Sequence, residues 1–420
     1  MQDYDGKWKK IFRNRLKSEV KIMNYESMIS EKMKGVKASA IREIFKVAGK
    51  PDIISFAGGL PAPESFPVDA IKKICNDILT EEPVTALQYG ISEGYAPLLE
   101  EIKKRLTEKF NIDMTKNEMI VVSGSQQGAD LLTKVLINEG DGVICEEPSF
   151  IGCLNTFRTY NAKLYGVPAN EDGMDIDILE KTLKENENIK MIYTIPTFQN
   201  PSGNTASLET RKKMLALAQK YNVIIMEDNP YGELRFTGED VPTIKSLDTT
   251  GNVVYIGSFS KVFSPGLRLA YMVFDKGLAE KIVVGKQATD VHTNVFAQMI
   301  AARYLKEYNI DESIEKSRDI YKHRCELMLS CMDKCFPKSV TYTRPEGGIF
   351  IWVTLPEGTD TLELMKEAVE KKVAFVPGNT FMTDIEKPCN SFRLNYSTMP
   401  DEKIIKGIEI LGELLKSKFN

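Results

Sequence analysis

Short apolar segments alternate with amphipathic helical patterns between about residues 84 and 274, and this alternation restricts the fold more than any other feature. The segments read M-I-V-V-S at 119–123, G-V-I-C at 142–145, M-I-Y-T-I-P at 191–196, V-I-I-M-E-D at 223–228 and V-V-Y-I-G at 253–257. Strands that alternate with helices are typical of a mainly parallel sheet covered by helices. The sequence therefore predicts an α/β fold.

The pattern changes after about residue 304. A long charged helix is expected there, followed by the strand G-G-I-F-I-W-V at 347–353, a helix, two strands and a final helix. This order predicts a second, smaller α+β domain. A chain of 420 residues of which 42% are hydrophobic is long enough to form a core in each domain.

A lysine follows the last strand of the first region, within the stretch G-S-F-S-K-V-F-S-P-G-L-R. Lys261 lies just beyond the carboxyl end of that strand, which is where ligands bind in open α/β sheets. Ser258, Ser260 and Arg268 add the hydroxyl and guanidinium donors that hold phosphate groups. An amine nucleophile beside such donors indicates a phosphorylated aldehyde cofactor.

Polar residues also follow two neighbouring strands. Asn200 stands in a turn that Pro201 and Gly203 define, and Asp228 closes an apolar strand shortly before Tyr231 in a second turn. An aspartate in this position is costly to bury without a partner, so it is a site candidate. Taken alone, a single aspartate in this position favours a helix cap or a turn residue.

A further strand leads into a helix through V-V-S-G-S-Q-Q-G-A at 121–129. Ser125 and the backbone N–H of Gln126 are expected at the amino end of that helix, which favours anions. Alone, this motif is a weak signal.

Charge and cysteine usage exclude several classes of protein. A net charge of −4 provides no overall basic field for nucleic acid or anionic lipid. The two histidines and seven cysteines, without a C-x-x-C pair, predict neither a metal site nor a disulfide framework. No apolar run reaches the ~20 residues of a membrane span, and the N-terminus lacks a signal-peptide core. We expect a cytoplasmic protein without nucleic-acid or membrane partners.

The first residues carry Trp8, Ile11, Phe12 and Leu16 at roughly helical spacing among basic residues. We interpret this segment as an amphipathic extension docked on the body of the protein. A nucleic-acid or membrane arm is the alternative.

Together, the motifs resemble the pyridoxal-phosphate enzymes of the aspartate aminotransferase fold (fold type I), and specifically the class I/II aminotransferases. The resemblance runs from about Ile41 to the C-terminus. It is carried by S-F-A-G-G-L-P at 55–61, Q-Y-G at 88–90, G-S-Q-Q-G, Q-N-P-S-G, E-D-N-P-Y, S-F-S-K-V-F-S-P-G-L-R and F-R-L-N-Y at 392–396. With A-S-A-I-R-E at 38–43, the chain most resembles the group of 2-aminoadipate and kynurenine aminotransferases.

The resemblance implies how the chain is divided and which cofactor it uses. The expected parts are an N-terminal extension over 1–34, a large cofactor-binding domain over 59–304, and a small domain built from 35–58 and 305–420. The implied cofactor is pyridoxal 5′-phosphate, with no metal. Lys261 matches the lysine that forms a Schiff base with it.

The resemblance also implies roles around the cofactor ring. Asp228 matches the acid that keeps the ring nitrogen protonated. Asn200 and Tyr231 match the residues that hydrogen-bond the phenolic oxygen, and Asn200 also borders the substrate. Phe150, in E-E-P-S-F, matches the aromatic residue that stacks on the ring, although an ordinary core phenylalanine is the alternative.

The remaining implied roles concern the phosphate and the substrate. The phosphate-binding residues are Ser125, Gln126 through its backbone, Ser258, Ser260 and Arg268, with Tyr89 supplied by the partner subunit of a homodimer. Arg393 matches the arginine that binds the substrate α-carboxylate. Arg42 and Gly59 are expected beside the substrate, although a lone helix arginine such as Arg42 is equally consistent with a solvated position.

The implied reaction moves an amino group from an amino acid to a 2-oxo acid, with 2-oxoglutarate as the expected acceptor, in two half-reactions. The donor is left open between 2-aminoadipate, aromatic amino acids and a broad range. One alternative is a β-lyase or decarboxylase, because fold and cofactor do not fix which bond breaks. The other, a non-enzymatic transcription regulator with an aminotransferase-like body, is disfavoured by the acidic charge and the short segment before Ile41.

Overall fold

The structure is a computed structural model that describes residues 23–34 and 52–419. Its chain divides into two units, Met1–Lys37 and Ala38–Asn420. In the first unit, the described residues form a 3-10 helix, η1 (Tyr25–Met28), and a short helix, α2 (Glu31–Lys34). The amphipathic segment expected around Trp8, Ile11, Phe12 and Leu16 lies outside the described residues, and so does Arg42.

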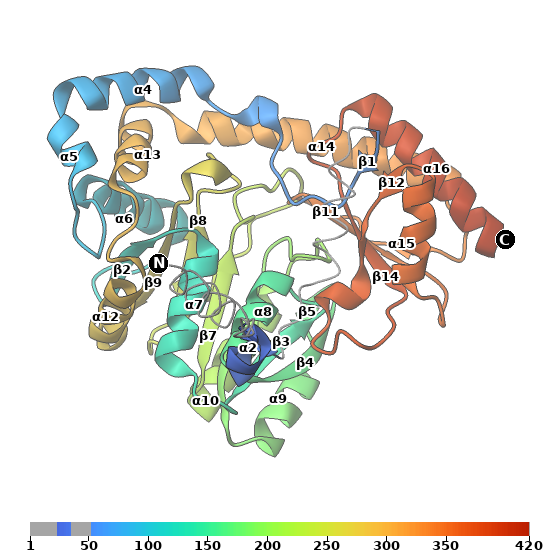
Figure 1. Cartoon of the computed structure of the whole chain (residues 1–420), viewed down its shortest axis with the longest axis horizontal. Coiled ribbons are helices and arrows are strands. Elements are labelled where there is room, and N and C mark those ends of the chain that lie inside the picture. Colours follow the sequence, from blue (N-terminus) through green and yellow to red (C-terminus); the bar gives the residue numbers. More distant parts are fainter. Residues whose placement is uncertain (1–22, 35–51, 420) are drawn as a thin grey trace, which may run out of the picture. The chain divides into compact units, whose positions relative to one another are not determined.

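The second unit contains an eight-stranded sheet in the order β2-β9-β8-β7-β6-β3-β4-β5 (Figure 1). The strands are β2 (Asn117–Val122), β3 (Gly142–Glu147), β4 (Lys163–Asn170), β5 (Gly173–Met174), β6 (Ile189–Thr194), β7 (Ile224–Asn229), β8 (Val253–Ser258) and β9 (Ala270–Asp275). In the row β8-β7-β6-β3-β4, all neighbouring strands pair in parallel. Strand β9 is antiparallel to both β2 and β8, and β5 is antiparallel to β4. The predicted α/β fold with a mainly parallel sheet is confirmed.

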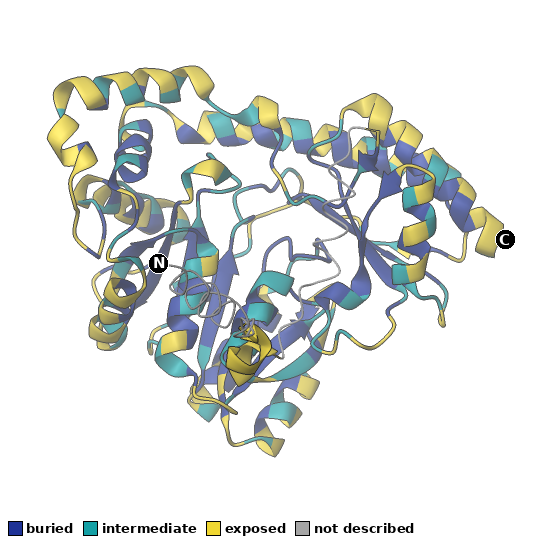
Figure 2. Cartoon of the chain, in the orientation of Figure 1, coloured by how far each residue is buried: buried dark blue, intermediate teal, exposed yellow. Residues whose placement is uncertain are grey.

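Helices cover this sheet with their apolar sides inward (Figure 2). The helices of this region are α4 (Val68–Glu81), α5 (Pro83–Leu87), α6 (Ala96–Phe110), α7 (Ser125–Leu136), α8 (Ile151–Thr159), α9 (Ile176–Glu185), α10 (Leu208–Tyr221), α11 (Ile244–Leu247), α12 (Ala279–Asp290) and α13 (Val295–Glu307), with 3-10 helices η2 (Pro63–Ser65), η3 (Pro265–Leu267) and η4 (Lys276–Leu278). Of these, α4 and α5 pack against α13 and lie away from the sheet. Because successive strand side chains alternate in direction, Met226 joins one core with Phe157 of α8, whereas Ile225 joins another with Met214 of α10. Both faces of the sheet are therefore buried.

A second, four-stranded sheet has the order β10-β11-β14-β13 and is antiparallel. Its strands are β10 (Thr341–Tyr342), β11 (Phe350–Thr354), β13 (Val376–Pro377) and β14 (Ser391–Asn395), and a separate parallel pair consists of β1 (Ile54–Ser55) and β12 (Val373–Ala374). The accompanying helices are α14 (Ile310–Cys335), α15 (Thr361–Glu370), η5 (Gly378–Phe381) and α16 (Asp401–Phe419). In Figure 1, the long helix α14 extends from the neighbourhood of α13 to α16.

One expectation for this region was wrong. The sequence analysis expected two strands between α15 and α16, but the chain forms three short ones there. The first expected strand is divided because β12 pairs with β1, whereas β13, after the single residue Phe375, pairs with β14. The division of the chain into a large and a small domain stays a prediction.

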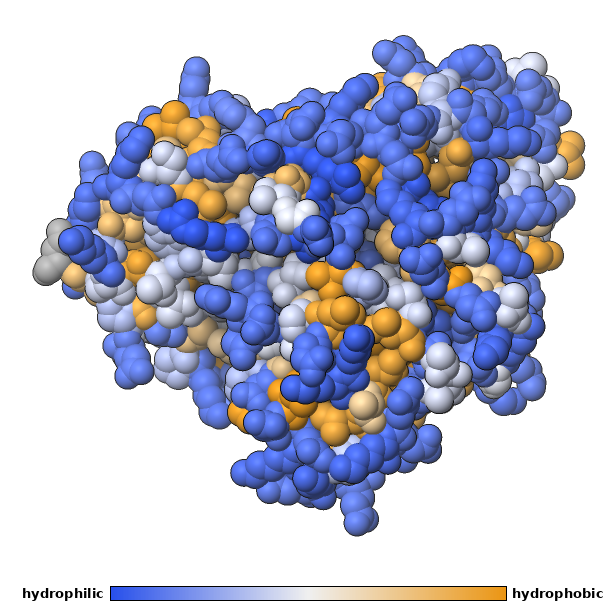
Figure 3. All heavy atoms as spheres, turned by 180° about the vertical axis from the view of Figure 1, so that it is seen from behind, coloured by the Kyte–Doolittle hydropathy of each residue, from blue (hydrophilic) through white to orange (hydrophobic). Residues whose placement is uncertain are grey.

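Hydrophilic residues cover most of the surface seen from behind, and hydrophobic residues gather in its lower middle part (Figure 3). Among the described residues, every helix is either too short or too polar to cross a lipid bilayer. The burial of apolar side chains between sheet and helices accounts for the mainly hydrophilic part of this surface.

Candidate active site

A cavity of about 410 Å³ lies beyond the carboxyl ends of β6, β7 and β8, where residues of the second sheet also reach it. Most residues implied by the resemblance line it: Gly59, Ser125, Gln126, Phe150, Asn200, Asp228, Tyr231, Ser258, Ser260, Lys261, Arg268 and Arg393. Parallel strands end at one edge of the sheet, so residues that are distant in sequence meet there.

Lys261 follows β8 and turns its amine into this cavity. The amine donates a hydrogen bond of 2.5 Å to the carbonyl oxygen of Gly59. Desolvation lowers the pKa of Lys261 to about 8, and the positive charges of Arg393 and Arg268 add to this effect. The amine therefore loses its proton near pH 8, well below the usual range of a lysine, and can then act as a nucleophile or a base.

Asp228, near the end of β7, presents a buried carboxylate to the same cavity. Its Oδ2 atom accepts a hydrogen bond of 3.2 Å from the hydroxyl of Tyr193, whereas Oδ1 has no hydrogen-bond partner among the described residues. Burial raises the pKa of Asp228 to about 7, and the bond from Tyr193 opposes this rise. A buried oxygen without a partner is able to receive a donor from a ligand.

Arg393 comes from β14 of the second sheet and is buried against the cavity. It donates to the Asn200 side chain at 2.7 Å and to the Ala57 carbonyl at 2.8 Å, while its Nε has no partner among the described residues. Its guanidinium carbon lies 4.1 Å from the ring centre of Phe350 and 5.0 Å from that of Phe381. Both rings lie within the distance of a cation–π contact and support the guanidinium group. An arginine can bind a carboxylate through two parallel hydrogen bonds.

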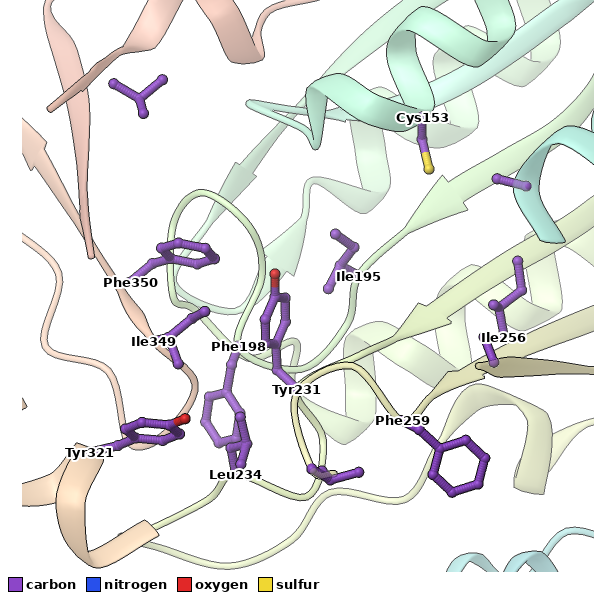
Figure 4. Packing of buried hydrophobic residues seen from close by; sticks show 14 of the residues in the cluster. Cys153, Ile195, Phe198, Tyr231, Leu234, Ile256, Phe259, Tyr321, Ile349 and Phe350 are labelled. Carbon is purple, nitrogen blue, oxygen red and sulfur yellow. The ribbon is translucent and has the colours of Figure 1, made fainter. Parts of the chain in front are cut away.

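Asn200 joins this arginine to Tyr231. Its amide nitrogen lies 3.5 Å from the Tyr231 hydroxyl, while its oxygen receives the bond from Arg393. In Figure 4, the Tyr231 hydroxyl points into the space between Phe350 and Ile195, both of which line the cavity. The Asn200 amide thus links the arginine to a phenol that faces the cavity.

A set of phosphate-type donors lies at another side of the cavity. Helix α7 begins at Ser125, whose hydroxyl has no partner among the described residues. Arg268 has a left-handed backbone (φ 54°) and donates to the Ser123 carbonyl at 3.4 Å, and Ser258 accepts from the Ser260 backbone at 3.1 Å. Gly124, with φ 88°, has no room for a Cβ, which would collide with the Arg268 guanidinium. This close approach forms a cradle for an anion at a helix amino end.

The aromatic residue Phe150 borders both α8 and the cavity. It is half-buried and precedes α8, and it packs against the buried core around it. Gly152 follows it closely, and a Cβ at this glycine would meet both the Phe150 ring and the Gln126 side chain at 2.5 Å. The absence of a side chain at Gly152 therefore leaves room for the Phe150 ring at the cavity wall.

Tyr89 is separate from this cavity. It is 82% exposed, packs edge-on against His292 at a ring distance of 5.7 Å, and lines a different cavity with Val295 and Gln298. Within one chain, the structure does not bring it to Lys261.

Several contributing residues were missed by the sequence analysis. Phe350 and Phe381 hold Arg393, but apolar residues in strands and turns give no signal for such a role. Glu146 stabilises the loop before Asn200, because it accepts hydrogen bonds from the Ile195 backbone at 3.1 Å and from the Gln199 side-chain amide at 3.2 Å. The position of Glu146 in E-E-P-S-F, at the end of a buried strand, was the available signal.

Comparison with known proteins agrees with this arrangement. The family model of aminotransferase class I and II matches residues 51–411. The chain is 42% identical to aromatic-amino-acid aminotransferase 1 of Thermococcus litoralis, covering 96% of this chain and 97% of the relative. It is 40% identical to the 2-aminoadipate transaminase of Thermus thermophilus, covering 91% and 94%.

A solved structure with the same fold is the kynurenine aminotransferase of Pyrococcus horikoshii in complex with PMP. It superposes with a TM-score of 0.91 at 40% identity, over 94% of this chain and 99% of that one. The fold and the polar cavity define an aminotransferase of the aspartate aminotransferase fold. The chain belongs to the class I and II aminotransferases, and it is a pyridoxal-phosphate-dependent enzyme that transfers amino groups.

The residues of the cavity fit this cofactor. Pyridoxal phosphate carries an aldehyde, a ring nitrogen and a phosphate, which need an amine, a carboxylate and an anion cradle. Lys261 has an amine of lowered pKa. Within the described part of the chain, Asp228 has an oxygen without a partner, and the Ser125 hydroxyl at a helix amino end has no partner either. Each functional group of the cofactor thus has a matching group in the cavity.

Proposed function

We propose that Lys261, Asp228 and Arg393 are the principal catalytic and substrate-binding residues of this aminotransferase. The observation that supports this most is that a buried carboxylate, one oxygen of which has no partner in the described ranges, shares one cavity with an amine of lowered pKa. When bound, the cofactor supplies an electron sink for the carbanion formed at the substrate Cα. Asp228 contributes a negative charge at the bottom of the cavity, and Lys261 Nζ moves the Cα proton.

Arg393 orients the substrate in this proposal. An α-carboxylate that binds two guanidinium nitrogens would be held at Arg393, beside Phe350 and Phe381, with its Cα directed toward Lys261. Asn200 keeps the guanidinium in place through its 2.7 Å bond. Together with Tyr231, it would hold the phenolic oxygen of the cofactor, and Phe150 would cover the ring.

The phosphate would be held by Ser125, the Gln126 backbone, Ser258, Ser260 and Arg268, with Tyr89 of a second subunit. Support for a homodimer comes from the surface around Tyr89, where Val84, Leu87 and Ile91 are 75%, 77% and 61% exposed. Neighbouring exposed apolar residues favour a protein interface. Sedimentation should give a dimer, and Tyr89→Phe should weaken phosphate binding there.

We place the enzyme in the cytoplasm, because all seven cysteines are free thiols. Unpaired thiols are typical of a reducing compartment.

For the amino donor we propose a broad range that includes aromatic and other apolar side chains, with 2-oxoglutarate as acceptor. Leu60, Ile151 and Phe350 line the cavity and offer apolar contacts. Two relatives of similar sequence identity to this chain are named for different donors, one for aromatic amino acids and the other for 2-aminoadipate. This also favours a broad donor specificity. Gly59 lies beside the amine and would border the substrate.

The test is a panel of twenty amino acids mixed with the holoenzyme, while the visible absorbance of the cofactor is followed. Amino donors should convert the cofactor to its amine form, and 2-oxoglutarate should restore it. Lys261→Ala should abolish this cycle, because the nucleophile and base is removed. Release of carbon dioxide or ammonia in place of transfer would support the decarboxylase or lyase alternative.

A second experiment separates the two proposed carboxylate readers. Arg42→Ala should lower kcat/KM for 2-aminoadipate by about tenfold to a hundredfold and leave leucine nearly unchanged, because only the first has a distal carboxylate. Arg393→Ala should affect both donors, since every donor has an α-carboxylate. Equal effects of Arg42→Ala on both donors would remove Arg42 from the proposal.

A further inference from the structure

Among the residues that the structure describes, one donates a hydrogen bond to the buried carboxylate of Asp228, and that donor comes from another strand. Tyr193 lies on β6 and is fully buried, and its hydroxyl donates to Asp228 Oδ2 at 3.2 Å. The parallel register pairs Tyr193 with Met226, two residues before Asp228 on β7. Residue 228 therefore has its side chain on the same face of the sheet as Tyr193.

The ring of Tyr193 is held rigidly. Phe157 of α8 packs against it edge-on, with ring centres 5.6 Å apart and an interplanar angle of 71°. Burial raises the pKa of Tyr193 well above its ordinary value, and the neighbouring Cys153 and Asp228 add to the rise. The phenol therefore stays protonated and donates its hydrogen to the carboxylate.

The two oxygens of the Asp228 carboxylate differ in their bonding, and this difference has a functional consequence. Oδ2 is occupied by the Tyr193 hydroxyl, and Oδ1 has no partner among the described residues. The tyrosine thus fixes the rotation of the carboxyl group and leaves one oxygen for a donor in the cavity. Without it, nothing described would oppose the tendency of burial to protonate Asp228.

We propose that Tyr193 is a positioning residue that keeps the Asp228 carboxylate ionised and aimed at the ring nitrogen of the cofactor. The inference rests on the proposed role of Asp228. The other titratable groups around this carboxylate are Cys153 from α8, Tyr231 from the loop after β7 and Lys261 from the loop after β8. Among the described residues, Tyr193 is the titratable group that forms a hydrogen bond with Asp228.

The test compares two isosteric variants. Tyr193→Phe removes the hydroxyl and keeps the ring, while Tyr255→Phe removes another buried hydroxyl, which accepts from Asn229 at 3.1 Å. The proteins are reconstituted with cofactor labelled with ¹⁵N in the ring, and the nitrogen chemical shift reports whether this nitrogen carries a proton.

In Tyr193→Phe, the nitrogen signal should move toward the unprotonated form, and the acidic limb of the kcat/KM profile should shift to higher pH. At pH 7, kcat/KM should fall by about tenfold to a hundredfold, as expected for one hydrogen bond to a charged group. Tyr255→Phe should leave the nitrogen signal and the pH profile unchanged. Equal behaviour of the two variants would overturn the proposal.

Two further measurements keep the outcome decisive. If Tyr193→Phe does not fold, 3-fluorotyrosine at position 193 keeps the ring and hydroxyl but donates more strongly, so the acidic limb should move to lower pH. An unchanged limb overturns the proposal. Asp228→Asn serves as the reference for the proposed function. If it leaves the nitrogen signal unchanged, the role of Asp228 fails; if it alone changes the signal, only the role of Tyr193 fails.

Discussion

Asp228 and Asn229 are neighbours on β7, and they face opposite sides of the large sheet. Each has a buried tyrosine from an adjacent strand, Tyr193 at 3.2 Å for Asp228 and Tyr255 at 3.1 Å for Asn229. Each also has a side-chain oxygen with no partner among the described residues. The two environments are similar in these respects, but Tyr193 donates to Asp228 whereas Tyr255 accepts from Asn229, and the two side chains face different cavities.

The two cavities differ in size and chemistry. Asp228 faces the cavity of about 410 Å³ that contains Lys261, whereas Asn229 lines one of about 210 Å³ together with Glu233 and Arg318. An acid without a counter-charge is costly in a buried place, while a neutral amide is not. Buried acids also stand on the opposite face, but Glu227 there accepts two backbone hydrogen bonds. The difference teaches that, at this pair of positions, the acid stands on the face whose cavity contains Lys261.

The largest difference between the two positions is expected when Asp228 is replaced by Asn. The substitution keeps the shape but removes the charge, so Cα deprotonation should slow by about a thousandfold or more while the cofactor still binds. Single-turnover absorbance measurements give this rate. The double variant that exchanges the two residues, Asp228→Asn with Asn229→Asp, should remain as slow, because its carboxylate lies on the wrong face. Activity within tenfold of the parent would contradict the proposed role.

A second prediction concerns the stability of the cofactor-free protein. Burial raises the pKa of Asp228 from 3.8 to about 7, so the folded state binds a proton that the unfolded state has lost. Stability should therefore decrease as pH rises from about 4 to 7, by up to about 4 kcal/mol. Asp228→Asn should remove this part of the pH dependence, as measured by urea unfolding at pH 4 and 8. If the unfolding free energies of parent and variant change equally with pH, the pKa of Asp228 is not raised in the folded state.

Lys261 gives a third test on the same face of the sheet. Its pKa of about 8 predicts that the rate of cofactor reconstitution rises about tenfold per pH unit below pH 8 and then levels off. The ordinary lysine value is 10.5. Stopped-flow absorbance on the cofactor-free protein measures the rate. The Asn229→Ala variant is the control, and its reconstitution rate should have the same pH dependence as that of the parent. A rate that continues to rise to pH 10 would mean that the amine is not perturbed.

The smallest effects are expected on the opposite face. Asn229→Ala removes the bond to Tyr255 and should lower the free energy of unfolding by about 1 kcal/mol. Because Asn229 does not face Lys261, kcat/KM should stay within about threefold of the parent. Urea unfolding of the holoenzyme and steady-state assays with one amino donor test both statements. A large loss of activity with unchanged stability would show that the two faces are coupled.

Much of the fold could be read from local patterns. The apolar segments at 142–145, 191–196 and 253–257 all lie in or overlap strands of the large sheet, and α7 begins at the expected Ser125. Periodicity predicts such elements because burial of one face requires it. The pattern failed where a single residue, Phe375, separates two strands that pair with different sheets, since pairing partners are not encoded locally.

For the site, the sequence by itself determined which chemical groups are present: an amine after β8, an acid at the end of β7 and an arginine in F-R-L-N-Y. Only the tertiary structure decided how they meet. Arg393 reaches Asn200 across 193 positions of sequence, and Tyr193 reaches Asp228 across 35. Strand alternation puts Asp228 and Asn229 on opposite faces, but which face holds the cavity depends on how the helices and the second sheet pack. That packing is a sum of many distant apolar contacts, so no short stretch of the sequence specifies it.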